Sequence, residues 1–126
     1  MSASLTPATW TVAQTRNCPG TGFGILACLF DPTQVFTLTN TGTVPLTGVG
    51  AGVLGGTATN VANYAIVGLF SNCGNATHTT LAPGATCTVA VQFKPLTAQP
   101  TGLKAATISV VTGAGTQTSA LNGTAN

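Results

Sequence analysis

Charge is what this sequence has least of. Of its 126 residues only Arg16, Asp31, Lys94 and Lys104 carry a formal charge, and glutamate is absent. Nucleic-acid binding needs several Lys or Arg side chains close together, because they must displace condensed counterions. Glycosidase chemistry needs a pair of carboxyl groups. The sequence therefore argues against a nucleic-acid partner and excludes a two-carboxylate glycosidase.

The same scarcity bears on hydrolytic catalysis in general. A nucleophile, a base and an orienting acid are needed together. The chain offers one histidine, His78, and one acid, Asp31, which directly precedes Pro32 as in a turn. We therefore expect that the chain is not an enzyme. Soluble monomers normally repel one another by charge. We therefore expect that a chain with so few charges either covers the edges of its sheets or is bound to a partner.

Long apolar runs are absent as well. No run approaches the roughly 18 residues of a membrane-spanning helix, which argues against a membrane partner. The first ten residues, MSASLTPATW, contain neither a basic region nor an apolar stretch. We therefore expect no secretory signal there.

Threonine is abundant instead, with 25 residues, and glycine follows with 16. Thr and Val favour the pleated surface of a strand and lose side-chain freedom in a helix. The length fits one domain over residues 1–126 with a core of its own. These features predict an all-β chain.

Alternation of apolar and polar residues is clearest in residues 34–42, QVFTLTNTG, where Phe36 and Leu38 point one way. This is the pattern of a half-buried strand, and we expect it to form a central hairpin with the apolar run 44–49. LAPG at 81–84 predicts a type II turn. Seven to nine antiparallel strands, with an inserted loop at 16–31, indicate an immunoglobulin-like β-sandwich. Further strands are expected at residues 5–15 (Trp10 and Val12 inward), 61–69 (Tyr64 and Ile66 on one face), 86–93, 105–111 and 117–121. The start of the segment 61–69 is also compatible with a helical turn.

A string of short motifs points to a family. It comprises LTNTGTVPLTGV (38–49), NYAI (63–66), CG (73–74), LAPGATCTVAVQFKP (81–95) and ALNGT (120–124). Together they resemble the choice-of-anchor D / ASPM-SPD-2-Hydin (ASH) class of immunoglobulin-like domains, over about residues 34–124 and more weakly over 5–12. The resemblance implies a non-catalytic module of surface, secreted or scaffolding proteins, and says little about its partner. The usual domain lacks the insertion at 16–31.

The four cysteines, Cys18, Cys28, Cys73 and Cys87, indicate disulfides and an oxidising final environment. Zinc sites typically contain C-x₂₋₄-C pairs, and the spacings here are longer, so we predict no metal and no cofactor. A bridge between Cys18 and Cys28 would close the insertion into a short loop. The family resemblance implies that Cys73 pairs with Cys87, which leaves Cys18 for Cys28.

Three further motifs have simpler explanations. GAGVLG at 50–55 matches the dinucleotide pattern G-x-G-x-x-G, but the following Gly-Thr is poorly suited to begin the helix that this motif needs. We expect an inter-strand loop there. His78 is expected to be a solvated loop residue, or at most a partner contact. Asn75 and Asn122 begin N-glycosylation sequons, which threonine-rich loops produce by chance.

An apolar run within the insertion, residues 25–30, is the candidate for a partner interface. One interpretation makes it a short extra strand over the core, and the other makes it a patch that docks on another subunit. The N-terminal arm, residues 1–6, is a second candidate, although termini often fray. The predicted interface residues are Phe23, Ile25, Leu26, Leu29, Phe30, Ser4 and Leu5.

The sequence favours a structural or interaction module. Our first hypothesis is a bacteriophage capsid decoration protein at the virion surface, whose partner is the major capsid protein or neighbouring copies. Release by lysis would reconcile paired cysteines with the missing export signal. The alternative is a domain of a bacterial secreted or cell-surface adhesion protein. A carbohydrate-binding module with weak glycan contact is the weakest hypothesis, because Trp10 and Tyr64 fall on buried faces.

Overall fold

The computed structural model describes residues 1–16, 18 and 31–126. In this part of the chain eight strands form two sheets, and no helix is long and apolar enough to cross a membrane. The strands are β1 (Ala3–Thr6), β2 (Thr9–Gln14), β3 (Thr33–Asn40), β4 (Val53–Gly55), β5 (Tyr64–Val67), β6 (Thr86–Phe93), β7 (Gly102–Thr112) and β8 (Gly115–Ala125). Two short helices, α1 (Ala58–Val61) and the 3₁₀ turn η2 (Gly68–Phe70), flank β5.

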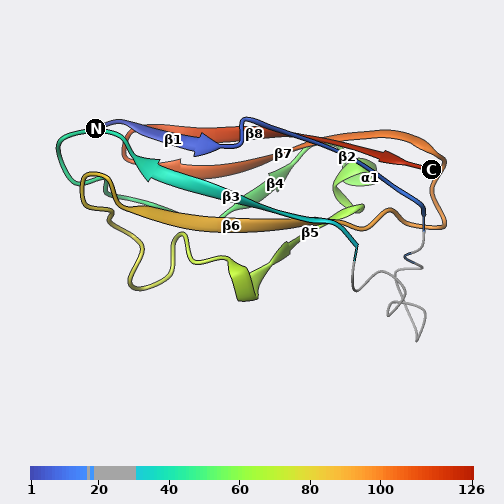
Figure 1. Ribbon diagram of the computed structural model, residues 1–126, viewed down its shortest axis with the longest axis horizontal. Helices are drawn as coiled ribbons and strands as arrows, with labels where there is room; N and C mark the ends of the chain where they lie inside the picture. Colours follow the sequence, from blue (N-terminus) through green and yellow to red (C-terminus); the bar gives the residue numbers. More distant parts are fainter. Residues whose placement is uncertain (17, 19–30) are drawn as a thin grey trace.

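The two sheets confirm the predicted immunoglobulin-like sandwich. The first sheet has the order β1-β3-β6-β5 and the second has the order β2-β8-β7-β4. These orders correspond to the ABED and GFC sheets of immunoglobulin domains. The pairing is not wholly antiparallel as expected, because β2 runs parallel to β8. Figure 1 shows the long strands running between the two ends of the molecule, with the N-terminus at one end and the C-terminus at the other.

The N-terminal segment differs from the single strand expected at 5–15. It is divided between the sheets: β1 pairs with β3 in the first sheet, and β2 pairs with β8 in the second. The break falls at Pro7, which follows a cis peptide bond and has no N–H to donate to a ladder. Trp10 and Val12 pack against the core as predicted, although both stay half-exposed.

The predicted central strand is confirmed, but its hairpin is wrong. β3 lies between β1 and β6, with Phe36 and Leu38 fully buried. Residues 44–49 form no strand. Their one ladder contact is the bridge between Leu46 and Leu81, and Leu46 and Val49 enter the core from a loop. Burial of an apolar run does not require a strand when its backbone is satisfied otherwise, here by the backbone of Leu81 and Thr79.

The predicted turn and the strands that follow it are confirmed. Gly84 has φ +81 and the Ala85 N–H donates to the Ala82 carbonyl at 2.8 Å, which is the type II geometry. In β6 the residues Cys87, Val89, Val91 and Phe93 are buried. β7 and β8 extend beyond the predicted 105–111 and 117–121 and meet in a tight turn.

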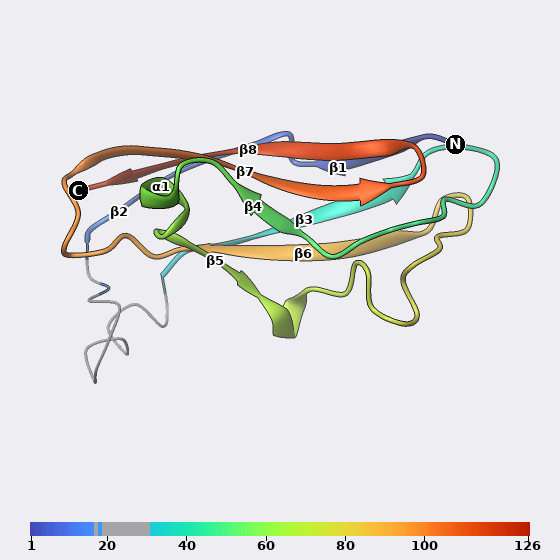
Figure 2. The same cartoon turned by 180° about the vertical axis from the view of Figure 1, so that it is seen from behind.

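The segment predicted as a strand at 61–69 forms a strand only over β5. Its start belongs to the end of α1, as the alternative of a helical turn allowed, and its last residues belong to η2. The Thr57 hydroxyl caps α1 by accepting from the Asn60 N–H at 3.2 Å, as an N-cap threonine does. Tyr64 is buried as expected. Ile66, expected to share its face, stays 36% exposed because β5 is an edge strand. Figure 2 shows α1 near the end that holds the C-terminus.

Two buried asparagines secure the loops at the opposite ends of the sandwich. Asn40 donates to the carbonyls of Val44 and Leu81, both at 2.8 Å, and accepts from the Gly42 N–H. Asn63 donates to the carbonyls of Thr59 and Asn60 and to the Gln99 side chain, and accepts from the Leu96 N–H. Both side chains satisfy loop backbone that no strand pairs, which holds the ends rigid.

Tyr64 joins the two sheets through its phenol. Its hydroxyl donates to the Lys104 carbonyl at 2.7 Å and accepts from the Gly123 N–H at 2.8 Å. Lys104 and Gly123 face each other in the β7–β8 ladder, so that the hydroxyl is inserted between the two strands. The ring packs on Phe93, with 5.0 Å between the ring centroids. Burial raises the pKa of Tyr64 above its usual value of 10.0, and the hydrogen bond from Gly123 lowers it in part.

Candidate functional site

The predicted partner interface is placed only in part. Phe23, Ile25, Leu26, Leu29 and Phe30 lie outside the described residues. Leu5 was wrongly assigned to the interface, because its side chain is 7% exposed and belongs to the core, on the inner face of β1. Ser4 lies on the outer face of the same strand and stays half-exposed. On β1, the side chains that a partner could contact are therefore the hydroxyl residues Ser4 and Thr6.

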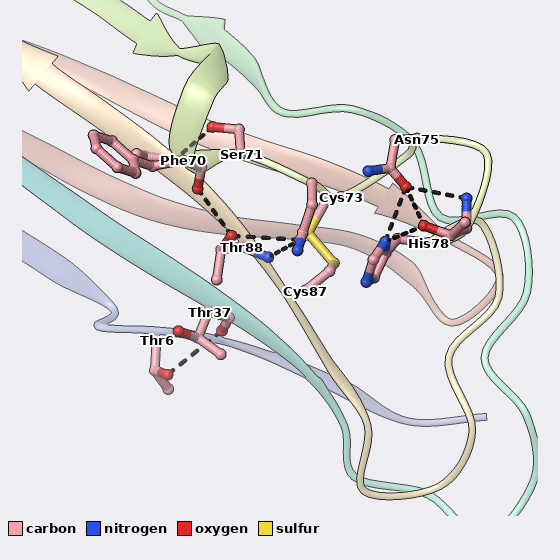
Figure 3. The surroundings of a disulfide bond; sticks show 12 residues. Thr6, Thr37, Phe70, Ser71, Cys73, Asn75, His78, Cys87 and Thr88 are labelled. Atoms are coloured by element: carbon pink, nitrogen blue, oxygen red, sulfur yellow. Dashed lines mark hydrogen bonds between the residues drawn. A yellow bond between two sulfur atoms is a disulfide. The ribbon is translucent and has the colours of Figure 1, made fainter.

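The pairing of Cys73 with Cys87 is confirmed. Figure 3 shows the disulfide between the loop that follows η2 and strand β6. Beside it, the N–H groups of Asn72 and Cys73 both donate to the Thr88 carbonyl. Cys18 is also disulfide-bonded, but its predicted partner Cys28 lies outside the described residues. The disulfide supports an oxidising, extracellular environment as the final location.

His78 lies half-buried in the loop after the disulfide (Figure 3). Its Nδ1 is 2.8 Å from the Thr77 hydroxyl and 2.9 Å from the Asn75 side-chain oxygen. In a hydrolytic triad the nucleophile and the orienting group contact different nitrogens of the imidazole. Here both contacts use one nitrogen, so that these three residues stabilise a turn. Among the described residues, no group of three or more His, Cys, Asp or Glu is placed to hold a metal ion.

The glycine motif at 50–55 does not have the dinucleotide-binding geometry. The expectation that no helix follows it was wrong, since α1 begins at Ala58. The last three motif residues, however, are strand β4 itself, whereas the motif requires its glycines in the turn between a strand and a helix. A helix of four residues also has too few aligned peptide units for a substantial dipole.

The outer face of the first sheet carries a regular array that the sequence analysis missed. Each of three neighbouring strands contains two outward hydroxyl residues separated by one buried residue. The strands pair in register, so that the hydroxyls form two rows across the sheet. One row is Ser4, Thr39 and Thr86, and the other is Thr6, Thr37 and Thr88. We call these six residues the hydroxyl face.

Four of these six hydroxyl groups are free to form hydrogen bonds with a ligand. The Thr88 hydroxyl donates to the Phe70 carbonyl at 2.9 Å, and the Thr6 hydroxyl lies 3.5 Å from the Thr37 carbonyl (Figure 3). Within the described residues, the hydroxyls of the other four members make no hydrogen bond to the protein. A free hydroxyl both donates and accepts, so these side chains offer both functions to a ligand.

Charge is kept away from the hydroxyl face. Arg16 contacts the C-terminal Asn126 and the Gln99 carbonyl, and Asp31 accepts from Gln14 at the end of β2. Lys94 directly follows β6, and Lys104 lies near the start of β7. All four formally charged side chains thus lie at the end of the sandwich that holds the C-terminus, whereas the row of Ser4 lies toward the opposite end (Figure 1).

One exposed aromatic lies at the edge of the first sheet. Phe70, in η2, is 58% exposed, and its neighbour Leu69 is 86% exposed. The sequence analysis considered Trp10 and Tyr64 as the aromatic candidates for sugar contact. Tyr64 is buried and Trp10 is half-exposed against the core, so that among the aromatic residues that the structure describes Phe70 offers a stacking surface beside β6.

Comparison with known proteins gives similarity of fold. No protein-family model and no curated protein matches the chain, so that the resemblance to choice-of-anchor D domains stays an expectation. Among solved structures, the chain is similar to the secreted serine protease VesC from Vibrio cholerae, with a TM-score of 0.53 and 18% identity over 74% of this chain. The Vibrio cholerae VesB protease matches with a TM-score of 0.47 and 18% identity. That match covers 99% of this chain and 31% of VesB.

The similarity to VesC contradicts the expectation that the chain is not an enzyme. That expectation rested on the shortage of titratable side chains, whereas VesC is described as a secreted serine protease. The similarity extends to the fold alone, and the chain spans about a fifth of VesC. A sandwich of this kind therefore occurs within the chain of an enzyme. The scarcity of acidic and basic side chains in this chain does not distinguish it from such a sandwich.

Proposed function

We propose that this chain is an extracellular interaction domain within a larger exported protein. The observation that carries the proposal is the share of VesC that the fold matches, 19% of a chain described as secreted. A sandwich that accounts for a fifth of a secreted protease serves there beside other parts of the polypeptide. By this likeness, our domain accompanies an exported enzyme or surface protein and attaches it to a target.

Two properties of the domain support this proposal. The Cys73–Cys87 disulfide is stable under oxidising conditions, which an exported protein meets. The hydroxyl face is uncharged, and it lies on the edge strand β1 and the central strands β3 and β6, whose inner faces pack in the core. A rigid, preorganised surface loses little conformational entropy on binding. The capsid decoration hypothesis predicts the same disulfide but requires a virion partner, which no observation on this structure favours.

Mass spectrometry of fractions from the source organism tests the proposal. Culture supernatant, washed cells and purified phage particles are digested with chymotrypsin, because three basic residues give trypsin few cleavage sites. We expect peptides of this chain in the supernatant or at the cell surface, joined to peptides from sequence outside residues 1–126. Recovery in phage particles at a fixed ratio to the major capsid protein would overturn the proposal in favour of the decoration hypothesis. Recovery only inside cells, with reduced cysteines, would overturn both.

A further inference from the structure

The edges of the two sheets differ in how well they are protected. Three of the edge strands are short, with four residues in β1, three in β4 and four in β5. Past the end of β5, side chains cover the neighbouring edge of β6. The Ser71 hydroxyl accepts from the Ala90 N–H at 2.9 Å, and the Asn72 side-chain oxygen accepts from the Thr88 N–H at 2.7 Å. Short strands and covered edges are common protection against pairing with another chain.

The edge strand β2 has none of this protection (Figure 1). It has six residues, and none of them is a proline or carries a charge. It pairs with β8 without a bulge from Thr9 to Gln14. The side chains of Thr9, Thr11 and Ala13 are exposed on its outer face. A straight, uncharged edge of this length is open to another strand.

The backbone of β2 is half unpaired. The Ala8 carbonyl accepts from the Ala120 N–H at 2.9 Å, and the Gln14 carbonyl accepts from the Asn126 N–H at 3.0 Å. Even-numbered residues therefore face β8, and the N–H and C=O groups of the odd-numbered residues between them point away from the sheet. Within the described part of the chain these outward groups have no hydrogen-bond partner.

A second copy of the chain presents a matching set of groups. With a two-fold axis through Thr11, perpendicular to the sheet, the two β2 strands run antiparallel and Thr11 lies opposite Thr11 of the second copy. Thr9 of each copy then lies opposite Ala13 of the other. All three pairs are of the kind that exchanges two N–H···O bonds, so that the outward backbone groups from Thr9 to Ala13 are satisfied. A shift by one residue would place outward side chains opposite inward ones.

The side chains on the inner face also fit a second copy. Trp10 and Val12 pack against the core but stay half-exposed. In this register Trp10 of each copy lies opposite Val12 of the other, in the kind of pair that brings side chains closest. An aromatic ring opposite a β-branched residue is a favourable cross-strand pair. The pairing therefore buries apolar surface that a single copy leaves in contact with water.

Like charge, which normally keeps identical chains apart, is nearly absent at this edge. The net charge of the chain is +2. Arg16 donates to the carbonyls of Asn126 and Gln99, and Asp31 accepts from Gln14, so that both charges lie at one end of β2. A two-fold axis through Thr11 places these ends of the two copies at opposite ends of the paired strands. An unrelated strand could bond to the same backbone, but the second copy brings Val12 opposite Trp10 without any like charge.

We propose that β2 pairs with β2 of a second copy of this chain, which joins the second sheets of the two copies into one continuous sheet. This self-association adds to the proposed attachment function and does not depend on it. A dimer presents two hydroxyl faces on one particle, and linked binding surfaces bind a repeated target more tightly than a single one.

Sedimentation velocity of the 126-residue chain over a range of concentrations tests the pairing. The variant is Thr11→Pro, which removes the outward N–H at the axis and leaves the ladder with β8 intact, because an edge strand tolerates proline where the N–H faces solvent. The matched control is Ala3→Pro in the edge strand β1. Its N–H also points outward, since the neighbouring Ser2 carbonyl faces β3 and accepts from the Thr41 N–H. Urea unfolding verifies that both variants are folded.

We expect the wild type and Ala3→Pro to form dimers with similar dissociation constants. In Thr11→Pro the dissociation constant should rise about 30-fold, because each copy loses one hydrogen bond to the other. A wild type that sediments as a monomer at every concentration would overturn the proposal. A dimer that Thr11→Pro weakens no more than Ala3→Pro does would overturn it too, since the contact would then lie elsewhere.

Disulfide cross-linking tests the register and does not require the proline variant to fold. Thr11→Cys places two thiols opposite each other, on Cα atoms about 5.5 Å apart, which is within the range of a disulfide. Thr9→Cys is the matched control, because the two Thr9 residues lie about 13 Å apart in this register. We expect covalent dimers of Thr11→Cys, and of a mixture of Thr9→Cys with Ala13→Cys, but not of Thr9→Cys alone. Equal cross-linking of Thr9→Cys and Thr11→Cys would contradict the pairing, whereas the extracellular location is tested separately by the fractions described above.

Discussion

Removal of the Cys73–Cys87 disulfide, through the paired substitution Cys73→Ala and Cys87→Ala, should lower the free energy of unfolding by about 3 kcal/mol. The two cysteines are 14 residues apart, and closing a loop of that length restricts the unfolded chain by roughly this amount. The unfolding entropy of a 126-residue chain is about 0.26 kcal/mol per kelvin. The melting temperature should therefore fall by about 11 °C.

Urea unfolding followed by fluorescence provides the assay, because the one tryptophan, Trp10, packs against the core and reports loss of structure. The paired variant is compared with the oxidised wild type, and the midpoint and the slope are fitted separately. Reductant added to the paired variant then isolates the contribution of the remaining bond at Cys18. A loss of less than about 1 kcal/mol would refute the reasoning, since the chain-entropy term would then be offset by strain in the native loop.

Three further predictions concern the core and the loop ends. Asn40→Ala removes three hydrogen bonds from buried loop backbone and should lower the free energy of urea unfolding by about 3 kcal/mol, whereas a loss below about 1 kcal/mol would mean that water replaces the amide. Gly123→Ala should destabilise by about 1–3 kcal/mol, because the added Cβ would lie 2.6 Å from the fully buried ring of Phe93; an unchanged melting curve would show that the ring can move. The raised pKa of Tyr64 means that above about pH 10 the unfolded chain loses its phenol proton first, so that stability falls by up to about 1.4 kcal/mol per pH unit. Urea midpoints at pH 9 and pH 11 should show this fall in the wild type and less of it in Tyr64→Phe, and equal falls in both would contradict it.

The sequence identifies the strands whose two faces differ in polarity. In β3 and β6 the apolar residues that the alternation places inward are buried, whereas Ala90, which it places outward, is buried as well. The pattern is less informative for the N-terminal segment, where alternation continues through Pro7 although the chain changes sheets there. It also fails for residues 44–49, because an apolar run is equally compatible with a strand and with a loop that drops side chains into the core.

The candidate site was missed for a related reason. The pairs of outward threonines in β3 and β6 are visible in the sequence as T-x-T, but their alignment depends on which strands pair and in what register. Register is a long-range property that one sequence does not contain. The buried roles of Asn40 and Asn63 are also long-range, since their partners include Leu81 and Gln99. Asparagine before glycine or near a turn predicts a local role only.

The core is what fixes the hydroxyl face. Each of its side chains is one residue away from a buried neighbour, and Leu38 separates Thr37 from Thr39 in the central strand. A slip of β3 by one residue would exchange the two faces, exposing Phe36 and Leu38 while burying hydroxyls without partners. The Cys73–Cys87 disulfide likewise holds the neighbouring strand β6 in its register. The core packing that stabilises the sandwich therefore also sets the regular spacing of the hydroxyl face. A variant whose core packing is unchanged should have the same spacing of the hydroxyl face.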